Sequence, residues 1–260
     1  MPVNLRYDLF QPMGQAMGDY RMIDNGDQIA VGLSGGKDSL ALLYALRRFQ
    51  RSAPVEFGLK AITVDMGYGT DWSPLAEFCR KLEVPYHVEP TAIATIVFDI
   101  RHEKNPCSLC ANLRRGALNN AALAQRCNKV ALAHHRDDAI ETLLLSLFFE
   151  ARLHCFSPVT YLSRKQLTVI RPLVYVSEAV TQRLARELPL PVVSSCCPAN
   201  GQTHRADMKN LLAELEDRYP GLRERMLTAL KNPSVSVPWR SGGGGEADQT
   251  RPQWPELPPR

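Results

Sequence analysis

A short glycine-rich turn carries the first group of residues that could do chemistry. It consists of Ser34-Gly35-Gly36-Lys37-Asp38-Ser39. The apolar segment before it (residues 28–33) predicts a buried strand, and the segment after it predicts a helix over residues 38–51. Glycines let backbone N–H groups approach phosphate oxygens, while a helix start and a lysine add positive charge. All of these residues are therefore candidates for binding nucleotide phosphates, and Lys37 and Asp38 are also catalytic candidates.

This turn differs from the Walker A loop. Only three residues separate Gly32 from Gly36 where the Walker A motif has four, and Asp38 follows the lysine where that motif has Ser or Thr. A carboxylate beside phosphates suits Mg²⁺, which binds proteins through one or two carboxylates together with phosphate oxygens. Asp65, at the end of the next expected strand (residues 59–65), is a further candidate for nucleotide binding.

A second motif follows a later expected strand (residues 129–133). It consists of Ala133-His134-His135-Arg136-Asp137-Asp138 and opens an expected helix over residues 137–150. Acidic residues suit a helix N-terminus by charge–dipole attraction, which gives both aspartates a structural explanation. Histidines and aspartates at the carboxyl end of a strand also fit a site. We therefore keep Asp137 and Asp138 as candidates for catalysis or Mg²⁺ binding, and His134 as a candidate for nucleotide binding.

Cysteines form the third group. The chain has seven, and it lacks an export signal, so a disulfide framework is not expected. Cys107 and Cys110 form a Cys-x-x-Cys pair, and Cys196 and Cys197 are adjacent. A thioredoxin-like redox pair would follow an early strand, with no phosphate loop upstream. A zinc site would need four ligands, whereas a [4Fe–4S] cluster held by three thiolates would leave one iron open for exogenous sulfide.

Strands alternate with helices along most of the chain. Strands are expected over residues 28–33, 59–65, 85–89, 129–133, 167–173 and 191–194, and helices over residues 38–51, 71–82, 109–125, 137–150 and 177–187. This alternation predicts an α/β fold with a doubly wound, mostly parallel sheet. Ligands of such sheets bind at the carboxyl ends of the strands, which is where the first two motifs lie.

The domain organisation is expected to be simple. Residues 1–25 should contain an N-terminal helix (residues 4–22), and residues 26–232 should form one nucleotide-binding domain that includes the cysteine site. Two closing helices are expected over residues 203–219 and 221–230. Residues 233–260 are rich in Gly, Pro and charge, which predicts a disordered tail.

The bulk composition is that of an ordinary globular protein, with 45% hydrophobic and 22% charged residues and a formal net charge of +4. No apolar run approaches the length of a membrane span, and the N-terminus lacks the hydrophobic region of a signal peptide. A cytoplasmic location without membrane association is therefore expected. So mild a charge does not by itself indicate a nucleic-acid partner.

In combination, the motifs resemble those of a known family. The string S-G-G-K-D-S resembles the PP-loop of enzymes that split ATP into AMP and pyrophosphate. Residues 133–138 resemble the G-H-x-x-D-D signature of PP-loop enzymes that act on RNA bases, with Ala133 in place of glycine. Together with C-S-L-C-x-x-L-R-R-G (residues 107–116) and V-I-R-P-L (residues 169–173), they resemble the tRNA 2-thiocytidine biosynthesis family. The resemblance covers about residues 5–231.

This resemblance implies an ATP-dependent tRNA sulfurtransferase. Such an enzyme adenylates the 2-oxygen of a cytidine in the anticodon loop, at position 32, and replaces that oxygen with sulfur delivered by a [4Fe–4S] cluster. The cluster ligands implied are Cys107, Cys110 and Cys197. Because better-studied members carry Cys-x-x-C in the third region, Cys196 stays an alternative to Cys197. The cofactors implied are ATP, Mg²⁺ and the cluster. The partners implied are tRNA and a cysteine desulfurase, and the implied assembly is a homodimer.

The sequence leaves two interpretations open for three arginines. Arg114, Arg115 and Arg136 are candidates for binding RNA phosphates or bases, and they are equally explained as charges on helix surfaces. Two other functions also stay open. One is a PP-loop sulfurtransferase that acts on a different tRNA base, and the other is a non-catalytic RNA-binding or iron–sulfur module that retains ATP binding.

Overall fold

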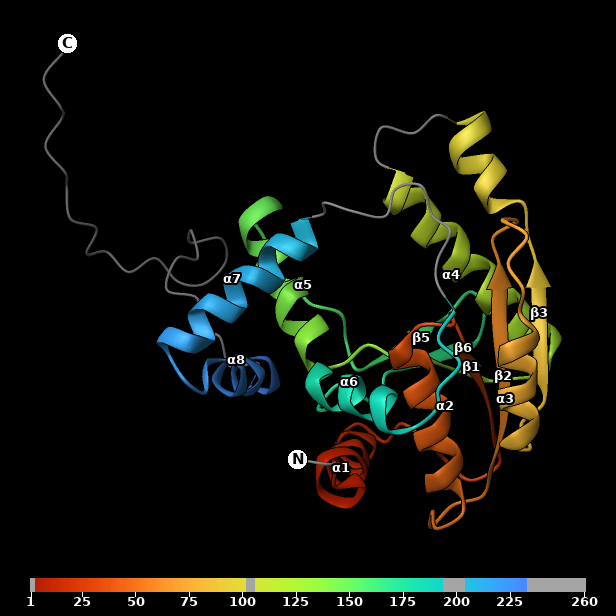
Figure 1. The fold of residues 1–260 in the computed structure, drawn as a ribbon, viewed down its shortest axis with the longest axis horizontal. Helices are drawn as coiled ribbons and strands as arrows, with labels where there is room; N and C mark the ends of the chain where they lie inside the picture. The colour runs from red at the N-terminus through yellow and green to blue at the C-terminus, as the bar shows by residue number, and fades with distance from the viewer. Residues whose placement is uncertain (1–2, 102–105, 194–203, 233–260) are drawn as a thin grey trace, which may run out of the picture.

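The computed structural model describes residues 3–101, 106–193 and 204–232. Within them, six strands form one sheet in the order β3-β2-β1-β4-β6-β5 (Figure 1). The strands are β1 (Asp27–Gly32), β2 (Phe57–Asp65), β3 (Tyr86–Pro90), β4 (Lys129–Ala131), β5 (Val159–Leu162) and β6 (Leu167–Ile170). Neighbouring strands from β3 to β6 run parallel, and the edge strand β5 pairs antiparallel with β6. The expected α/β fold with a mostly parallel sheet is therefore confirmed.

Helices connect the strands and close the fold. Two short π-helical turns are η1 (Leu5–Phe10) and η2 (Thr95–Ile100). The α-helices are α1 (Gln11–Asp19), α2 (Lys37–Gln50), α3 (Ser73–Lys81), α4 (Pro106–Ala124), α5 (Arg136–Phe149), α6 (Glu178–Glu187), α7 (His204–Arg218) and α8 (Leu222–Lys231). No helix in the described part of the chain combines the length and the apolar character needed to cross a bilayer.

The sheet separates two apolar cores. Ile29 and Ala30 are neighbours in β1 and point to opposite faces, so they belong to different cores. On one face, Ile29 packs with Leu42 of α2, in a core to which α1, α3 and α6 also contribute. On the other face, Ala30 packs with Ile62 of β2 and Leu118 of α4. Burial on both faces explains why β1 is continuously apolar from Ile29 to its end.

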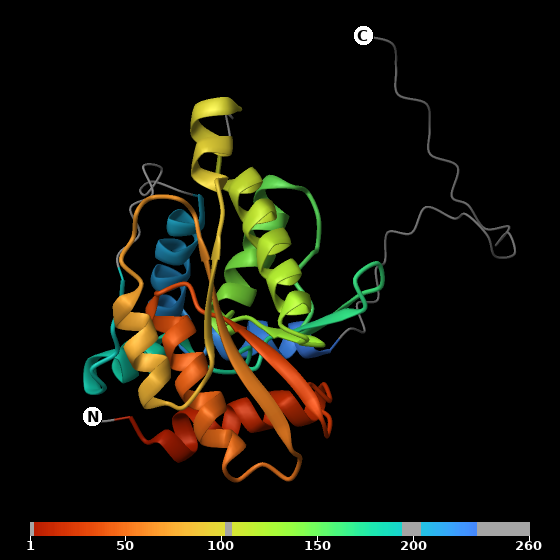
Figure 2. The same cartoon turned by 90° about the vertical axis from the view of Figure 1, so that its right-hand side faces the viewer.

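Helices α5, α7 and α8 form a smaller unit beside the sheet. Ile140 and Leu144 of α5 pack against Met208 and Leu212 of α7 in a separate apolar cluster. In Figure 1 these helices lie on the opposite side of the molecule from β3, and in Figure 2, which is viewed from the β3 side, the blue helices α7 and α8 lie behind the strands. The expected closing helices are thus present, and they cover the start of α5, where the second motif lies.

Several segments differ from the sequence-based expectation. Residues 191–193 form no strand, because Pro189 and Pro191 lack the N–H groups that a ladder needs, and Ser194 lies outside the described residues. Strand β5 was not expected, since it is only four residues long and pairs through a hairpin at the sheet edge. The expected helix over residues 4–22 is divided into η1 and α1 and ends at Asp19.

Helix α4 begins at Pro106, earlier than the expected start at residue 109. Cys107 and Cys110 therefore lie on the first turns of α4 rather than in a loop before it. The expected third cysteine, Cys197, its neighbour Cys196 and the expected tail over residues 233–260 lie outside the described residues.

Candidate active site

The glycine-rich turn between β1 and α2 is held by its own serines. Gly35 has a φ of +83°, in the left-handed region that favours glycine, and Gly36 is the N-cap of α2. The Ser39 hydroxyl donates to the Gly36 carbonyl at 2.8 Å and accepts from the Ser34 backbone N–H at 3.1 Å. These bonds fix the turn at the N-terminus of α2, a geometry that suits an anion.

Helix α4 comes close to the end of β1 because Gly32 has no side chain. A Cβ atom at this position would lie 2.9 Å from Cδ2 of Leu118, which is closer than carbon atoms pack. Gly32 therefore allows α4, which carries Cys107 and Cys110, to lie over the strand that leads into the phosphate turn.

Lys37 lies within a group of alternating charges. Its Nζ donates to Asp38 at 2.8 Å and to Glu178 at 3.1 Å, and Lys209 of α7 donates to Glu178 at 2.8 Å. Burial lowers the pKa of Lys37, but the hydrogen bonds and charges of Asp38 and Glu178 outweigh it, so this pKa lies above its usual value. Burial raises the pKa of Glu178, whereas Lys209 and Lys37 together bring it down to about 2. Both groups are therefore ionised near neutral pH.

The second motif forms a capping box at the start of α5. His135 is the N-cap, and its Nδ1 accepts from the Asp138 backbone N–H at 3.2 Å. In return, Asp138 Oδ2 accepts from the His135 backbone N–H at 2.9 Å, while Asp138 Oδ1 accepts from Arg205 of α7 at 3.2 Å. The box explains why this carboxylate is held in one orientation.

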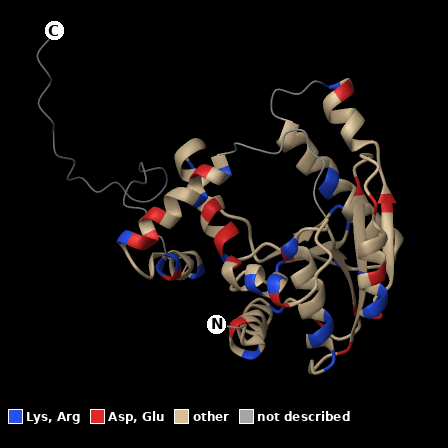
Figure 3. Ribbon diagram, viewed as in Figure 1, with Lys and Arg blue, Asp and Glu red and all other residues tan. Residues whose placement is uncertain are grey.

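Asp137 faces a different direction from Asp138. It is only 4% exposed. One of its oxygens accepts from the Glu178 backbone N–H at 2.8 Å, and the other pairs with Arg223 of α8. Arg136 likewise pairs with Glu224 of α8. These two residues of the motif therefore connect α5 to α6 and α8. Figure 3 shows the acidic and basic segments that alternate where α2, α5 and α6 meet.

A cavity of about 700 Å³ joins the three groups of candidate residues. It lies at the carboxyl ends of β1, β2 and β4, and its volume is that of a small-molecule site. The polar lining includes Ser34, Gly36, Asp38, Ser39, Tyr68, Thr70, His134, Asp138, Cys110, Arg114, Arg115 and Asn119. Apolar side chains, including Ile62, Val64, Leu118 and Leu132, form the rest of the wall together with Trp72.

Helix α4 turns one face towards this cavity. Cys110, Arg114 and Leu118 follow one another at intervals of four residues, so they lie along one side of the helix. Cys107, one turn before Cys110, is exposed. Near the apolar wall, Asn119 Oδ1 and Trp72 Nε1 are buried without a hydrogen-bond partner among the described residues. A bound ligand with complementary groups would satisfy such atoms.

His134 lies on the cavity wall and contacts Arg171, which follows β6. Arg171 Nε donates to His134 Nδ1 at 3.2 Å. Burial, reinforced by the positive charges of Arg171 and Arg205, lowers the pKa of His134 to about 4, although Asp138 acts in the opposite direction. His134 is therefore neutral near neutral pH. Burial also lowers the pKa of Arg171 to about 10, with a contribution from Arg115.

The structure does not bring every sequence-based candidate to the cavity. Asp65 is engaged with the turn that follows β2, where its carboxylate accepts from the Gly67 N–H at 3.0 Å. Asp137 and Arg136 point away, as described above. Lys37 and Gly35 lie in the phosphate turn beside the lining residues. Among the described residues, no three His, Cys, Asp or Glu side chains are placed to hold a metal ion together.

Several residues near the site were missed by the sequence analysis. They are Glu178, Thr181, Arg205, Lys209 and Arg223, all on the three helices α6, α7 and α8. Thr181 donates to Asp38 at 2.5 Å, so it fixes the carboxylate of the phosphate turn. No motif marks these residues, because each belongs to an ordinary amphipathic helix. Only their distance from the first two motifs in the folded chain identifies them.

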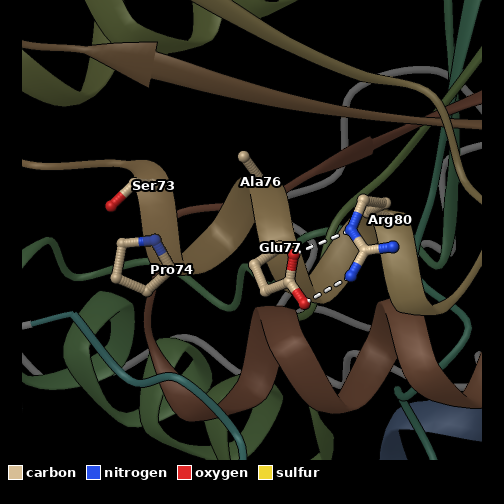
Figure 4. A pocket seen from close by; sticks show the side chains of 5 residues that line it. All are labelled: Ser73, Pro74, Ala76, Glu77 and Arg80. Atoms are coloured by element: carbon tan, nitrogen blue, oxygen red, sulfur yellow. Dashed lines mark hydrogen bonds and ion pairs between the residues drawn. The ribbon is translucent and has the colours of Figure 1, made fainter.

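A second hollow, of about 520 Å³, lies on the surface of α3 (Figure 4). It is lined by Ser73, Pro74, Ala76, Glu77 and Arg80. The Glu77 carboxylate accepts two hydrogen bonds from the Arg80 guanidinium, each of 2.8 Å. Because the polar groups are already paired and none of the three motifs reaches this hollow, we do not assign it a function.

The fold, the phosphate turn and the adjoining cavity define a PP-loop protein, and a family model described as the PP-loop domain matches residues 6–195. Within that class, the chain belongs to the tRNA-cytidine(32) 2-sulfurtransferase family. It is 44% identical to the tRNA-cytidine(32) 2-sulfurtransferase of Pelobacter propionicus over 85% of this chain and 83% of that protein. It is 42% identical to the Geobacter sulfurreducens protein of the same name, over 88% and 91%.

A solved structure supports the fold independently. The U34-tRNA thiolase NcsA from Methanococcus maripaludis with its [4Fe-4S] cluster superimposes with a TM-score of 0.69 at 23% identity. The match covers 85% of this chain and 76% of that one. The curated relatives confirm the family expected from the sequence motifs, and this solved structure shows that the fold is shared with a more distant protein.

Proposed function

We propose that this protein thiolates tRNA in an ATP-dependent reaction. The target would be the 2-oxygen of a cytidine in the anticodon loop, at position 32, as in the names of its relatives. The observation that carries the proposal is the single cavity lined by the phosphate turn, the second motif and Cys110. ATP activates the 2-oxygen and sulfide attacks the carbon that bears it, so both sets of groups must reach one space.

ATP would bind with its β- and γ-phosphates on residues 34–39. The backbone N–H groups of the turn, the N-terminus of α2 and the Lys37 ammonium all place positive charge there. Mg²⁺ fits the same place, because Asp38 lines the cavity beside Ser39 and Asp138 presents a second carboxylate. Each carboxylate is already oriented, Asp38 by Thr181 and Asp138 by His135.

The first step transfers AMP from ATP to the base. The 2-oxygen of cytosine attacks the α-phosphorus, the bond to the β-phosphate oxygen breaks, and pyrophosphate leaves. Negative charge then builds on the departing pyrophosphate, where Lys37 and the turn amides stabilise it. The 2-oxygen, a poor leaving group, has become part of a phosphate ester. In the second step a sulfide forms a bond to carbon 2, and AMP departs with the original oxygen.

The cysteine residues fit a metal cluster that supplies this sulfide. Cys107 and Cys110 lie one turn apart at the start of α4, so both thiols point to the same side of the helix, and Cys110 lines the cavity. A [4Fe–4S] cluster, when bound, would hold the incoming sulfide on an iron that no protein thiolate ligates. Cys107, Cys110 and Cys197 would be its ligands.

The position of Val193 supports a third ligand from the pair Cys196 and Cys197, of which we propose Cys197. The Val193 backbone N–H donates to the Gly35 carbonyl at 3.0 Å, and Val193 lines the cavity. Cys197 follows four residues later, and a chain segment of that length spans at most about 14 Å. Cys196 stays the alternative because it satisfies the same limit.

The tRNA must present its base to this cavity, and α4 offers the charges to guide it. Arg114 and Arg115 line the cavity and are exposed, so they can contact RNA phosphates or the base. Arg136 pairs with Glu224, which favours a structural role for it. Bases of an anticodon loop are unpaired, so turning one out of its stack costs less than in a duplex.

The experiment that tests this function is nucleoside mass spectrometry of bulk tRNA from a strain that lacks the gene, compared with its parent and a complemented strain. Loss of 2-thiocytidine alone, restored by the gene, would support the reaction and the substrate. Loss of a different thionucleoside would keep the chemistry and change the target base. Unchanged thionucleosides would contradict the proposal and would favour a module that binds ATP or RNA without catalysis.

A further inference from the structure

Arg171 makes a set of contacts that fixes it beneath the cavity wall. Its Nε donates to His134 Nδ1 at 3.2 Å, and its Nη1 donates to the Ser157 carbonyl at 2.6 Å and to Thr160 Oγ1 at 3.4 Å. Its guanidinium carbon lies 4.9 Å from the centre of the Phe156 ring. Ser157 and Phe156 thus hold the guanidinium in the position from which it reaches His134, and the longer contact with Thr160 adds little.

This contact determines which nitrogen of His134 carries the proton. A guanidinium group has donors only, so Nδ1 must act as the acceptor in the bond with Arg171. In a neutral imidazole the proton then lies on Nε2. We propose that Arg171 is a positioning residue that holds His134 as the neutral Nε2–H tautomer, so that His134 offers the cavity a hydrogen-bond donor and not a general base.

The orientation of the ring follows from the same contacts. Phe156 packs against His134 with ring centres 4.9 Å apart and planes inclined by 34°, which restricts rotation of the imidazole. His134 lines the cavity and Arg171 does not, so Nδ1 is directed to the protein side. Nε2, on the other side of the ring, is the nitrogen left for a ligand.

The electrostatic environment supports a neutral donor. Burial and the charge of Arg171 disfavour a second proton on His134, and Arg205 and His135 add to this effect. The charge of Asp138 acts in the opposite direction and favours the proton, but its effect is smaller. A neutral imidazole N–H suits an oxygen acceptor. This inference rests on the proposed function, which brings two such acceptors to the cavity: the α-phosphate of ATP and the 2-oxygen of the target base.

The tautomer can be measured without any assay of tRNA thiolation. The full-length protein would be purified anaerobically with ¹⁵N-labelled histidine, and the six histidines would be separated by comparison with a His134→Gln variant. We expect Nδ1 of His134 to show the resonance of an unprotonated ring nitrogen and Nε2 that of a protonated one at pH 7. A proton on Nδ1 at that pH would overturn the inference.

Variants then test whether Arg171 maintains this state. Arg171→Met should change the His134 nitrogen resonances and lower the single-turnover rate roughly 10- to 100-fold, as loss of a positioning partner of a functional histidine commonly does. Thr160→Val is the matched control, because it removes another contact of Arg171 and leaves the bond to His134. It should keep both the tautomer and the rate. If Arg171→Met also kept both, the inference would be wrong.

Substitutions at His134 identify the acceptor. His134→Gln retains an N–H donor near the position of Nε2, so it should keep more activity than His134→Ala. If the acceptor is the α-phosphate, His134→Ala should weaken ATP binding without tRNA. If it is the base oxygen, ATP binding should stay as in the parent and the single-turnover rate should fall. Equal behaviour of Gln and Ala in both assays would contradict a donor role for His134.

Discussion

Lys37 and Glu178 lie 141 positions apart in the sequence, yet the Lys37 ammonium lies 3.1 Å from a Glu178 carboxylate oxygen. Glu178 is shared with Lys209 of α7, so a single carboxylate connects the phosphate turn to a closing helix. Phosphate oxygens that reach Lys37 must compete with this carboxylate. The ion pair thus places a negative charge where the phosphates of the proposed substrate are also negative, so we expect it to reduce the affinity for ATP while it holds Lys37 in position.

The first prediction concerns this competition. Glu178→Gln removes one negative charge near the phosphates and leaves the side-chain shape, so ATP binding should tighten by on the order of 1 kcal/mol. For Lys37 itself, the Lys37→Ala variant should abolish AMP formation. Isothermal titration with Mg-ATP measures the change in ATP affinity of Glu178→Gln. Glu187→Gln, with the same change in charge at the far end of α6, is the control and should bind as the parent does. Weaker binding by Glu178→Gln would show that the position of Lys37 matters more than the competition.

The second prediction separates the two aspartates of the second motif. Asp137 is buried and pairs with Arg223, so Asp137→Asn should destabilise the fold by about 3 kcal/mol, the typical result of leaving a buried partner unpaired. Asp138 lines the cavity, so Asp138→Asn should mainly lower the rate of AMP formation. Urea denaturation and a pyrophosphate-release assay distinguish the two effects. A stable, inactive Asp137→Asn protein would place that carboxylate in catalysis instead.

The fold was largely predictable from the sequence, and so was the edge of the sheet at which the first two motifs lie. Residues 34–39 and 133–138 each follow an apolar strand. A short apolar run of this kind is recognisable in the sequence because it corresponds to a buried strand of a parallel sheet. The partners of these motifs were not predictable. Glu178 begins a helix, where an acidic residue is explained by the helix dipole alone. Likewise, Asp137 and Asp138 are adjacent and chemically alike, and only helices α6, α7 and α8 show that their carboxylates face different partners.

The third prediction tests the cysteine site. Cys107→Ser and Cys110→Ser should lose bound iron and the broad visible absorbance of an anaerobically purified parent, because each removes a thiolate from the same side of α4. Iron and sulfide analysis would accompany the spectra. Cys155→Ser is the control, since that thiol donates to the Ala139 carbonyl at 3.3 Å and burial raises its pKa to about 11. It should retain the iron. A colourless parent with one zinc ion per chain would contradict the cluster.

The fourth prediction follows from the environment of His134. Its pKa is about 4 in the folded protein and near 6.5 in an unfolded chain. Between these values the unfolded chain takes up a proton that the folded protein does not bind, so the free energy of unfolding should decrease as the pH falls from 6.5 to 4. The total change from this group is about 3 kcal/mol, and it should level off below pH 4. Above pH 6.5 both states are neutral at this position, so His134 adds no pH dependence there.

Urea denaturation of the parent and of His134→Gln at a series of pH values measures this contribution. The variant cannot take up the proton, so its stability should change less than that of the parent between pH 6.5 and 5, above the range in which most carboxylates titrate. Parallel curves for the two proteins in this window would mean that the folded protein does protonate His134. Arg171→Met gives a further comparison, because without the nearby guanidinium charge the folded pKa should rise and the decrease in stability should become smaller.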